Sequence, residues 1–192
     1  MECRNVYTSR RSIRKFQPGI PISSIIIENL LEVAASAPSS WNFQPWRFLV
    51  IQDQTSKEKL YPIVYQQPQV IECSTVVVFL GDLDVGAHAD KLQKLSEDQG
   101  TLSKLDIPYS EEAYVEHALR DTSFALMQFM LAARERGLDT CLLHFDKPLL
   151  MKCLNLSDQY LPVAIATIGY AAQAPKPKLR FSINELIHYK SF

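Results

Sequence analysis

The chain has 192 residues, of which 47% are hydrophobic and 21% are charged, and its net charge is -1. These values are those of an ordinary globular protein with one sizeable core, and they exclude a disordered or fibrous chain. The near balance of charge excludes a global attraction to nucleic acid or to a membrane surface. We therefore expect a single domain over residues 1–192 that has neither of these partners.

The first strongly predicted helix lies over residues 25–37. Ser23 or Ser24 can cap it, and its apolar residues cover most of its circumference, which predicts a deeply buried helix. Pro38 ends the helix, and the short polar side chains of residues 39–42 predict a loop.

Two strands and a helix are predicted next. Residues 47–51 form a predicted strand, and Thr55 begins a capping-box spacing that predicts a helix. Residues 75–81 are apolar without polar alternation, as expected of a central strand that helices cover on both faces. The polar segment that follows has only weak helical signals, so we expect a mobile, lid-like excursion over residues 82–120.

A long helical region is predicted from Ser110 to Arg136, and Gly137 can act as its left-handed stop. Residues 124–133 within it are apolar nearly all round. Such a helix must be enclosed on every side, either by the sheet of its own chain or by a second subunit.

The last predicted elements are a short strand and loop at 140–145, a helix at 148–154 capped by Asp146, and a buried strand at 163–170. The tail at 178–189 alternates enough to form an extended arm. It has little of its own chain to pack against, and a partner chain would provide the missing packing surface.

Several kinds of site are disfavoured by the absence of their motifs. The four cysteines and four histidines show no spacing typical of a metal site, a redox pair or a disulfide framework. No glycine-rich dinucleotide or P-loop motif and no nucleophile elbow is present. The N-terminus lacks the apolar core of a secretion signal, and no apolar run could span a bilayer. We therefore predict a cytoplasmic protein with reduced thiols and no metal.

Three polar clusters are candidates for a binding site: residues 10–14, the loop at 38–45, and residues 178–180. Arg and Lys supply charge-assisted donors for a phosphate, and Ser, Asn and Gln supply the donors and acceptors that a flavin ring edge requires. Each cluster alone has a simpler interpretation as solvated charge or turn chemistry. Likewise, Gln66 and Gln69 are interpreted as surface helix residues, and His144 as a structural histidine.

Taken together, these clusters resemble the nitroreductase family of FMN enzymes over nearly the whole chain. The most specific match is the run Ala-Pro-Ser-Ser-Trp-Asn-Phe-Gln-Pro-Trp at 37–46, accompanied by 10–16, 127–133, 137–140, 168–170 and 178–180. The resemblance implies an α+β fold with a central mixed, mainly antiparallel sheet sandwiched by helices. It also implies an intertwined homodimer with two FMN sites at the interface, in which each subunit extends its arm, residues 178–192, over the other.

The resemblance further implies a set of FMN-binding residues: Arg10, Arg11, Ser12, Arg14, Pro38, Ser39, Ser40, Asn42, Gln66, Gln69, Leu142, Leu143, His144, Lys178 and Arg180. Residues 10, 12, 178 and 180 would hold the phosphate, and residues 38–42 would come from the other subunit. The glutamines, which depart from the family in residue type, would lie on the pyrimidine side. Residues 141–144, a loop one residue shorter than in the family, would lie near flavin N5. Arg14, near N1 and O2, would raise the reduction potential.

The implied activity is electron transfer from NADH or NADPH, through FMN, to small electron-poor acceptors such as nitroaromatics, quinones and flavins. In this ping-pong mechanism the donor leaves before the acceptor stacks on the same face, and no catalytic acid or base is required. Two alternatives stay open: another flavin activity, such as reductive dehalogenation or flavin fragmentation, and a non-enzymatic module that binds an anionic partner. The sequence specifies neither the physiological acceptor nor the preferred nicotinamide.

Overall fold

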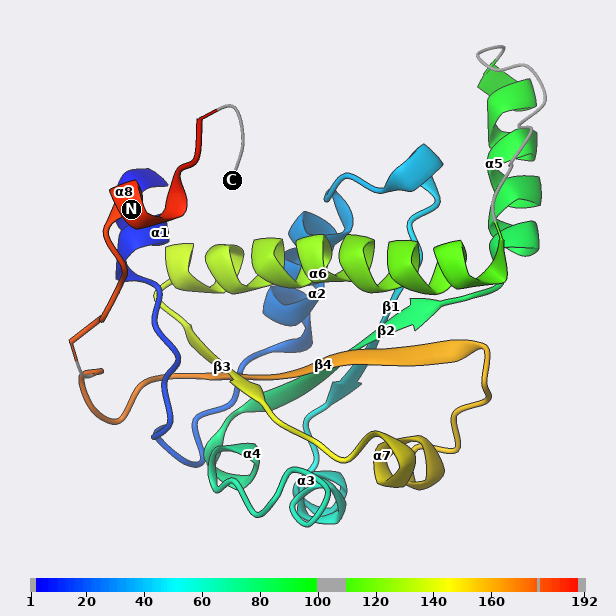
Figure 1. The fold of residues 1–192 in the computed structure, drawn as a ribbon. Helices are drawn as coiled ribbons and strands as arrows, with labels where there is room; N and C mark the ends of the chain where they lie inside the picture. The colour runs from blue at the N-terminus through cyan, green and yellow to red at the C-terminus, as the bar shows by residue number, and fades with distance from the viewer. Residues whose placement is uncertain (1–2, 100–109, 176, 190–192) are drawn as a thin grey trace.

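A four-stranded sheet lies between two layers of helices in the computed structural model, which describes residues 3–99, 110–175 and 177–189 (Figure 1). The elements in chain order are α1 (Cys3–Ser9), α2 (Ser24–Ala35), η1 (Ser40–Asn42), β1 (Trp46–Ile51), α3 (Gln54–Leu60), α4 (Gln69–Glu72), β2 (Thr75–Asp82), α5 (Val85–Gln99), α6 (Glu111–Glu135), β3 (Asp139–Leu143), α7 (Lys147–Cys153), β4 (Tyr160–Gly169) and α8 (Ile183–Leu186). The strand order is β1-β2-β4-β3, with antiparallel pairing throughout. The α+β class and the mainly antiparallel, helix-flanked sheet are confirmed. Parallel pairing among the described residues is limited to an isolated bridge between Ser12 and Thr140.

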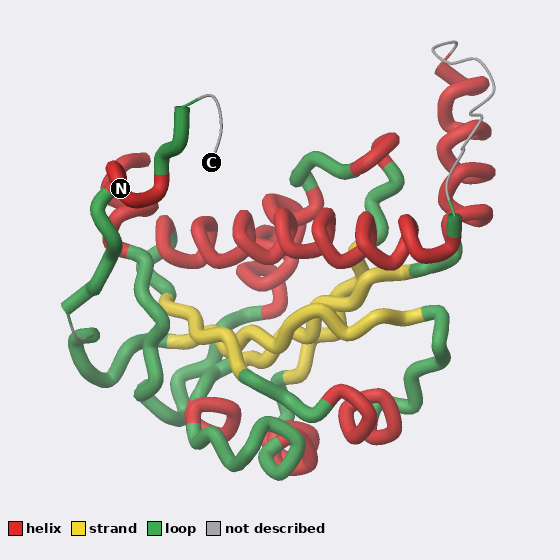
Figure 2. The backbone as a smooth tube through the Cα atoms, viewed as in Figure 1, coloured by secondary structure: helices red, strands yellow, loops and turns green. Residues whose placement is uncertain are grey.

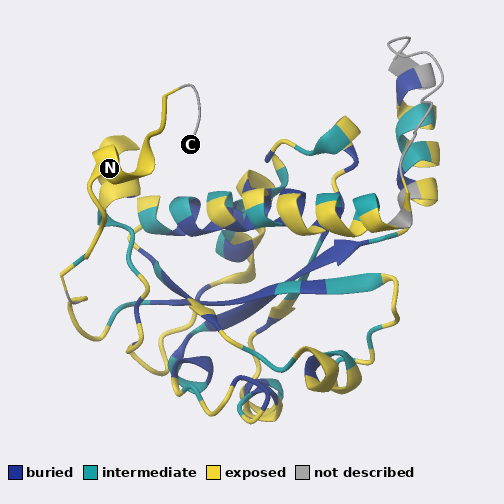
Figure 3. Cartoon of the chain, viewed as in Figure 1, coloured by how far each residue is buried: buried dark blue, intermediate teal, exposed yellow. Residues whose placement is uncertain are grey.

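Strand β2 forms the centre of the core, and its whole length is buried. Val77 and Phe79 belong to the cluster that packs on α2 and α6, whereas Val76 and Val78 belong to the cluster that packs on α3, α4 and α7. This alternation follows from the two-residue period of a strand. The prediction of a central strand covered on both faces is therefore confirmed, and Figure 3 shows the deep burial of the sheet.

Side-chain caps determine where several helices begin. Ser23 caps α2 by accepting a hydrogen bond from the backbone N–H of Ile26 at 3.4 Å, and Asp146 caps α7, as predicted. The predicted start of the next helix at Thr55 is wrong. Asp53 caps α3 instead, because its carboxylate accepts from the backbone N–H of Ser56 at 2.8 Å.

The segment predicted as a mobile, lid-like excursion, residues 82–120, contains regular structure in its described parts. Asp82 ends β2, Val85–Gln99 is the helix α5, and residues 111–120 belong to α6. In Figure 1, α5 projects away from the sheet beside the start of α6. The helical signals in this part of the sequence are weak because α5 is predominantly polar and contains Gly86. The remaining residues of the excursion, 100–109, lie outside the described residues.

Helices α2 and α6 are each covered on one side only. Ile27 of α2 is buried, but Ile25 is 68% exposed and Val33 is 45% exposed, so the prediction of a deeply buried helix is wrong for this outer face. In α6, Phe124 and Met127 are both 43% exposed. The sheet of the same chain therefore does not enclose α6 as its sequence requires.

The C-terminal tail lies along the end of the molecule that carries the N-terminus, and it contains the short helix α8 within loop (Figures 1 and 2). The prediction of an arm with little to pack against agrees with its exposure: Leu179 is 88% exposed and Phe181 is 76% exposed. Within the described ranges, no helix combines the length and apolar character needed to cross a bilayer.

Candidate functional site

The N-terminal segment runs along β3, which is an edge strand of the sheet. The backbone N–H of Ile13 donates to the carbonyl of Thr140 at 3.0 Å, next to the Ser12 bridge. Ile13 and Phe16 are both buried, so they anchor the segment. The arginines at positions 10, 11 and 14 are thereby held beside this edge of the sheet.

Four cations from the two ends of the chain gather at the start of this segment. Partial desolvation and the charges of Arg180, Arg10 and Arg11 together lower the pKa of Lys178. Because the four like charges repel one another, the arrangement is suited to a multiply charged anion such as a phosphate. A cavity of about 300 Å³ opens beside Arg11.

A polar group lies further along β3. Gln69 is only 4% exposed, so its interpretation as a surface residue is wrong. Its amide nitrogen makes long contacts, 3.4 Å to Oε1 of Gln67 and 4.0 Å to Sγ of Cys141. Burial raises the pKa of the Cys141 thiol, and the charge of Arg14 and the hydrogen bond from Gln69 oppose that rise. Arg14 and Gln69 therefore both lie close to Cys141.

An exposed aromatic pair follows at the end of β3. The ring of His144 stacks on that of Tyr65, with centroids 5.3 Å apart and planes 21° from parallel. The carbonyl of His144 accepts a hydrogen bond from Nε2 of Gln67 at 2.9 Å. Tyr65 and Gln66 have φ values of 53° and 56°, a left-handed turn that few non-glycine residues adopt. Gln66 lies in this turn, next to Gln67, whose side chain bonds to His144 at the end of β3.

The two leucines of β3 differ in what they can offer to a ligand. Leu142 is 42% exposed, whereas Leu143 is buried within the core cluster of α3, α4 and α7. Leu142 can present its side chain, and Leu143 can contribute only its backbone. The predicted residues on this side of the molecule, together with Cys141, are called the edge strip: Arg10, Arg11, Ser12, Arg14, Gln66, Gln69, Cys141, Leu142, Leu143, His144, Lys178 and Arg180.

The loop at residues 38–45, called the clamped loop, is fixed to α6 by a buried carboxylate. Oδ2 of Asp121 accepts from the backbone N–H of Ser40 at 2.8 Å, and Oδ1 pairs with Nε of Arg120 at 3.0 Å. Arg120 also donates to the hydroxyl of Ser40. Trp41 and Asn42 adopt left-handed φ values of 53° and 59°, and such strain persists only where surrounding contacts enforce it.

The edge strip and the clamped loop do not meet within one chain. The edge strip follows β3, whereas the clamped loop leads into β1, and these strands are opposite edges of the sheet. The structure thus brings the other predicted residues to one side of the sheet, but it leaves Pro38, Ser39, Ser40 and Asn42 apart from them (Figure 1).

Sequence reasoning missed three residues that shape these surfaces: Arg120, Asp121 and Tyr65. The signal for the first two was an Arg-Asp pair directly before the apolar part of a helix, because a charge in that position requires a partner when buried. No local pattern distinguished Tyr65, whose stacking partner is far away in the sequence.

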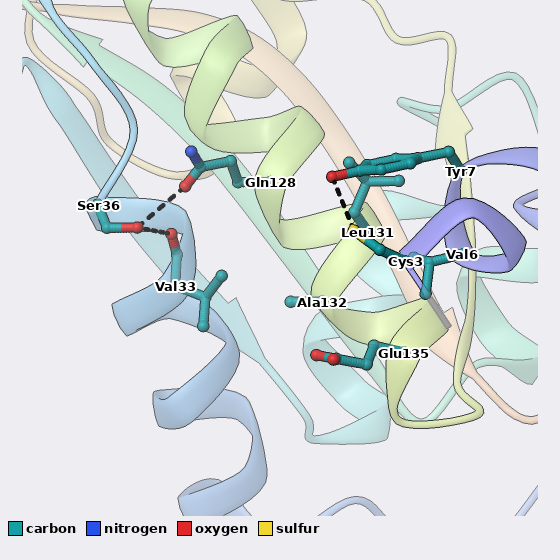
Figure 4. Close-up of a pocket in the computed structure, with 9 residues that line it drawn as sticks. All are labelled: Cys3, Val6, Tyr7, Val33, Ser36, Gln128, Leu131, Ala132 and Glu135. Atoms are coloured by element: carbon teal, nitrogen blue, oxygen red, sulfur yellow. Dashed lines mark hydrogen bonds between the residues drawn. The ribbon is translucent and has the colours of Figure 1, made fainter. Parts of the chain in front are cut away.

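A pocket of about 350 Å³ between α1, α2 and α6 contains none of the predicted site residues (Figure 4). Val6, Val33 and Leu131 give it an apolar wall, and Ser36 donates to Oε1 of Gln128 at 3.1 Å on its rim. Nowhere in residues 3–99, 110–175 and 177–189 do three His, Cys, Asp or Glu side chains form a group that could hold a metal ion.

The family model described as the nitroreductase family matches residues 7–170. The chain is 32% identical to the Bacillus subtilis protein YodC, whose name describes it as an NAD(P)H nitroreductase, over 95% of this chain and 96% of that protein. It is 31% identical to an enone reductase of Lactiplantibacillus plantarum, over 92% and 89% of the two chains.

Two solved structures share the fold over nearly their whole length. One is an Exiguobacterium sibiricum protein described as a nitroreductase in complex with FMN, with 29% identity, a TM-score of 0.91, and coverage of 99% of this chain and 98% of that one. The other is a Staphylococcus epidermidis protein described as an NAD(P)H:FMN oxidoreductase, with 27% identity, a TM-score of 0.91, and coverage of 98% and 95%.

Proposed function

Because the chain belongs to the nitroreductase family, we propose that it is an FMN-dependent oxidoreductase that takes electrons from NADH or NADPH and passes them to small electron-poor acceptors. The observation that carries this proposal is the cluster of four cations at the start of the edge strip. Lys and Arg groups are gathered there from both ends of the chain at an electrostatic cost, which a phosphate-bearing cofactor would offset.

The residues present fit FMN in charge and in hydrogen-bonding capacity. Arg10, Lys178 and Arg180 would hold the phosphate, with Ser12 as a neutral donor, and Arg11 of the same cluster would lie along the ribityl chain. Further along, the buried amide of Gln69 has only long protein contacts, so it can bind the polar edge of a ring. When bound, FMN supplies the chemistry of accepting and releasing two electrons.

Arg14 has a separate role in this proposal. Its charge acts on the buried Cys141, which Gln69 also contacts, and such a cation stabilises negative charge on a neighbouring ring. The neighbouring aromatic pair, Tyr65 and His144, presents an exposed flat surface on which a planar donor or acceptor can stack. Donor and acceptor would use this surface in turn, which is the physical basis of a ping-pong scheme.

The proposal includes a homodimer in which the clamped loop of one chain completes the edge strip of the other. Support comes from the separation of the two groups and from the exposed apolar side chains on α2 and α6, including Ile25, Val33, Phe124 and Met127. The exposed arm, with Leu179 and Phe181, would bury its apolar side chains on the partner. The four free cysteines agree with the reducing cytoplasm as the compartment.

The decisive experiment is a visible absorption spectrum of the purified protein, with the released cofactor identified by mass. We expect a flavin spectrum, FMN as the released species, and bleaching by NADH or NADPH that a nitroaromatic, a quinone or an enone reverses. A colourless protein that stays inert after FMN and both nicotinamides are added would refute the proposal. Salt-sensitive binding to an anionic polymer without flavin would favour a non-enzymatic module instead. Turnover of only halogenated acceptors would favour reductive dehalogenation.

A further inference from the structure

A further cavity, of about 360 Å³, lies between α5, the end of the clamped loop and the start of β1. None of the residues predicted to bind FMN lines it. Its lining combines the apolar side chains of Phe43, Trp46, Leu92 and Leu95, called the apolar wall, with the cations Arg47 and Lys91, called the polar wall. We propose that this cavity binds an organic carboxylate that carries an apolar chain or ring. The inference goes beyond the proposed function and does not depend on it.

Arg47 is a preoriented cation on the polar wall. Its Nη2 pairs with Oδ2 of Asp82 at 2.8 Å, and its Nη1 donates to the carbonyls of Trp46 at 2.9 Å and Gln44 at 3.2 Å. These bonds fix the guanidinium, yet 43% of its side chain stays exposed. A fixed guanidinium loses little conformational freedom when it binds a carboxylate.

The polar wall carries an excess of positive charge even when the ion pair between Arg47 and Asp82 is taken into account. Asp82 is its carboxylate, and it also accepts from Nε2 of Gln159 at 2.9 Å and from the backbone N–H of Asp84 at 3.1 Å. Arg47 and Lys91 together bring two positive charges against this one negative charge. A ligand with one negative charge would balance the wall.

His88 provides a second, independent observation that points to a ligand. Its side chain is nearly buried, and its Nε2 lies 2.7 Å from Nη2 of Arg47 and 3.2 Å from Oδ2 of Asp82. The other ring nitrogen, Nδ1, is buried without a hydrogen-bond partner among the described residues. Such atoms are rare in native proteins, and a polar group bound in the cavity that His88 lines can supply the partner.

The apolar wall determines the rest of the ligand. Phe43 and Trp46 are buried beneath the cavity, while Leu95 is 48% exposed on the projecting helix α5. A small inorganic anion would leave this wall in contact with water, whereas an alkyl chain or aromatic ring would cover it. The volume lies within the range of small-molecule sites in proteins.

The first experiment compares three probes by titration calorimetry on the purified full-length protein. Octanoate has both the charge and the chain, octanamide has the chain without the charge, and acetate has the charge without the chain. We expect octanoate to bind saturably, once per chain, and the other two to bind at least about tenfold more weakly. Equal binding of octanoate and octanamide, or no saturable octanoate binding, would overturn the proposal.

The second experiment uses variants of the two walls. Lys91→Glu should weaken octanoate binding by about tenfold, and Leu92→Trp, which fills the cavity, should abolish it. Lys147→Glu makes the same charge change at the start of α7, in the opposite helical layer, and should leave binding unchanged. The FMN absorbance of each variant reports the proposed function separately.

Two outcomes of the variant experiment would contradict the inference. One is an equal loss of octanoate binding in Lys91→Glu and Lys147→Glu, because the effect would then follow net charge rather than position. The other is a change of oligomeric state in Leu92→Trp without any octanoate binding by the parent chain. That result would assign the cavity to contact with a second copy. If Leu92→Trp does not fold, the comparison of Lys91→Glu with Lys147→Glu still tests the inference.

Discussion

The edge strip and the clamped loop are built by different physical means. The edge strip joins both ends of the chain at a sheet edge, and its character comes from cations that repel one another. The clamped loop is continuous in sequence, and one buried carboxylate, that of Asp121, holds it to α6. One chain therefore carries two different parts of a binding site. We expect the edge strip of one copy to combine with the clamped loop of a second copy.

The largest expected effect is complementation between two defective chains. Arg180→Ala damages the edge strip, and Asn42→Gly removes a side chain from the clamped loop while keeping the left-handed backbone accessible. Each variant alone should bind FMN more weakly than the parent chain at both sites. A mixed dimer, isolated with two affinity tags, should regain one site of normal FMN affinity, measured by cofactor fluorescence. If both halves of a site came from the same chain, no normal site could appear in the mixed dimer.

Asp121→Ala tests how the clamped loop is held. The backbone N–H of Ser40 and the Nε of Arg120 would lose their common acceptor, so we expect the free energy of unfolding to fall by about 3 kcal/mol. Urea denaturation measures this change. Asp121→Asn keeps an acceptor for Ser40 and serves as the control, with a smaller loss. Equal losses in both variants would mean that charge, rather than the hydrogen bond to the loop, is what matters.

Arg180→Ala probes the edge strip alone. Removing one charge-assisted phosphate contact should weaken FMN binding by roughly 1.5–3 kcal/mol, while the midpoint of urea unfolding of the apoprotein stays unchanged. Equilibrium titration with FMN measures the first quantity. Arg136→Ala removes an exposed arginine at the end of α6 and should leave FMN affinity intact. Unchanged affinity in Arg180→Ala would place the arm away from the cofactor.

The smallest expected effect is a difference in acid sensitivity between the two regions. Near the clamped loop, burial of Asp82 is outweighed by hydrogen bonds from Gln159 and Asp84 and by the charge of Arg47, which lower its pKa. The folded state then binds this proton less readily than the unfolded state does. The stabilisation is present above the ordinary value of 3.8 and is lost as the pH falls through the lowered pKa.

Asp139, beside the edge strip, has the opposite sign. Burial raises its pKa despite the ion pair with Arg134, so its contribution falls as the pH rises from 3.8 through the raised value. Unfolding free energies measured against pH should therefore flatten below 3.8 in Asp82→Asn and above 3.8 in Asp139→Asn. An unchanged pH profile in either variant would contradict the assigned sign.

The sequence predicted the elements whose signals are local. The unbroken valines of β2, the stop at Gly137 and the cap at Asp146 each depend on neighbouring residues, and each prediction is confirmed. Helix α5 was missed because few of its residues are apolar and because Gly86 lies near its start.

The same limit applies to the candidate site, where contacts between residues distant in sequence could not be predicted. The cations of the edge strip were named from the sequence by resemblance, but Gln69 is buried in contact with Cys141, a residue distant in sequence. The anchor of Ser40 lies 81 positions away, at Asp121. No pattern within the loop reveals that partner.

Helix α6 contacts both regions, and this has a geometric consequence. Near the middle of the helix, Asp121 holds the clamped loop, and near its end, Arg134 donates to Ser9 and pairs with Asp139 beside the N-terminal segment. The two positions are thirteen residues apart in sequence, which corresponds to about 20 Å at the rise of an α-helix. The helix thus fixes the spacing between the clamped loop and the N-terminal segment. Adding or removing one residue within it would rotate one attachment by about 100° relative to the other, whereas surface loops elsewhere can change length freely.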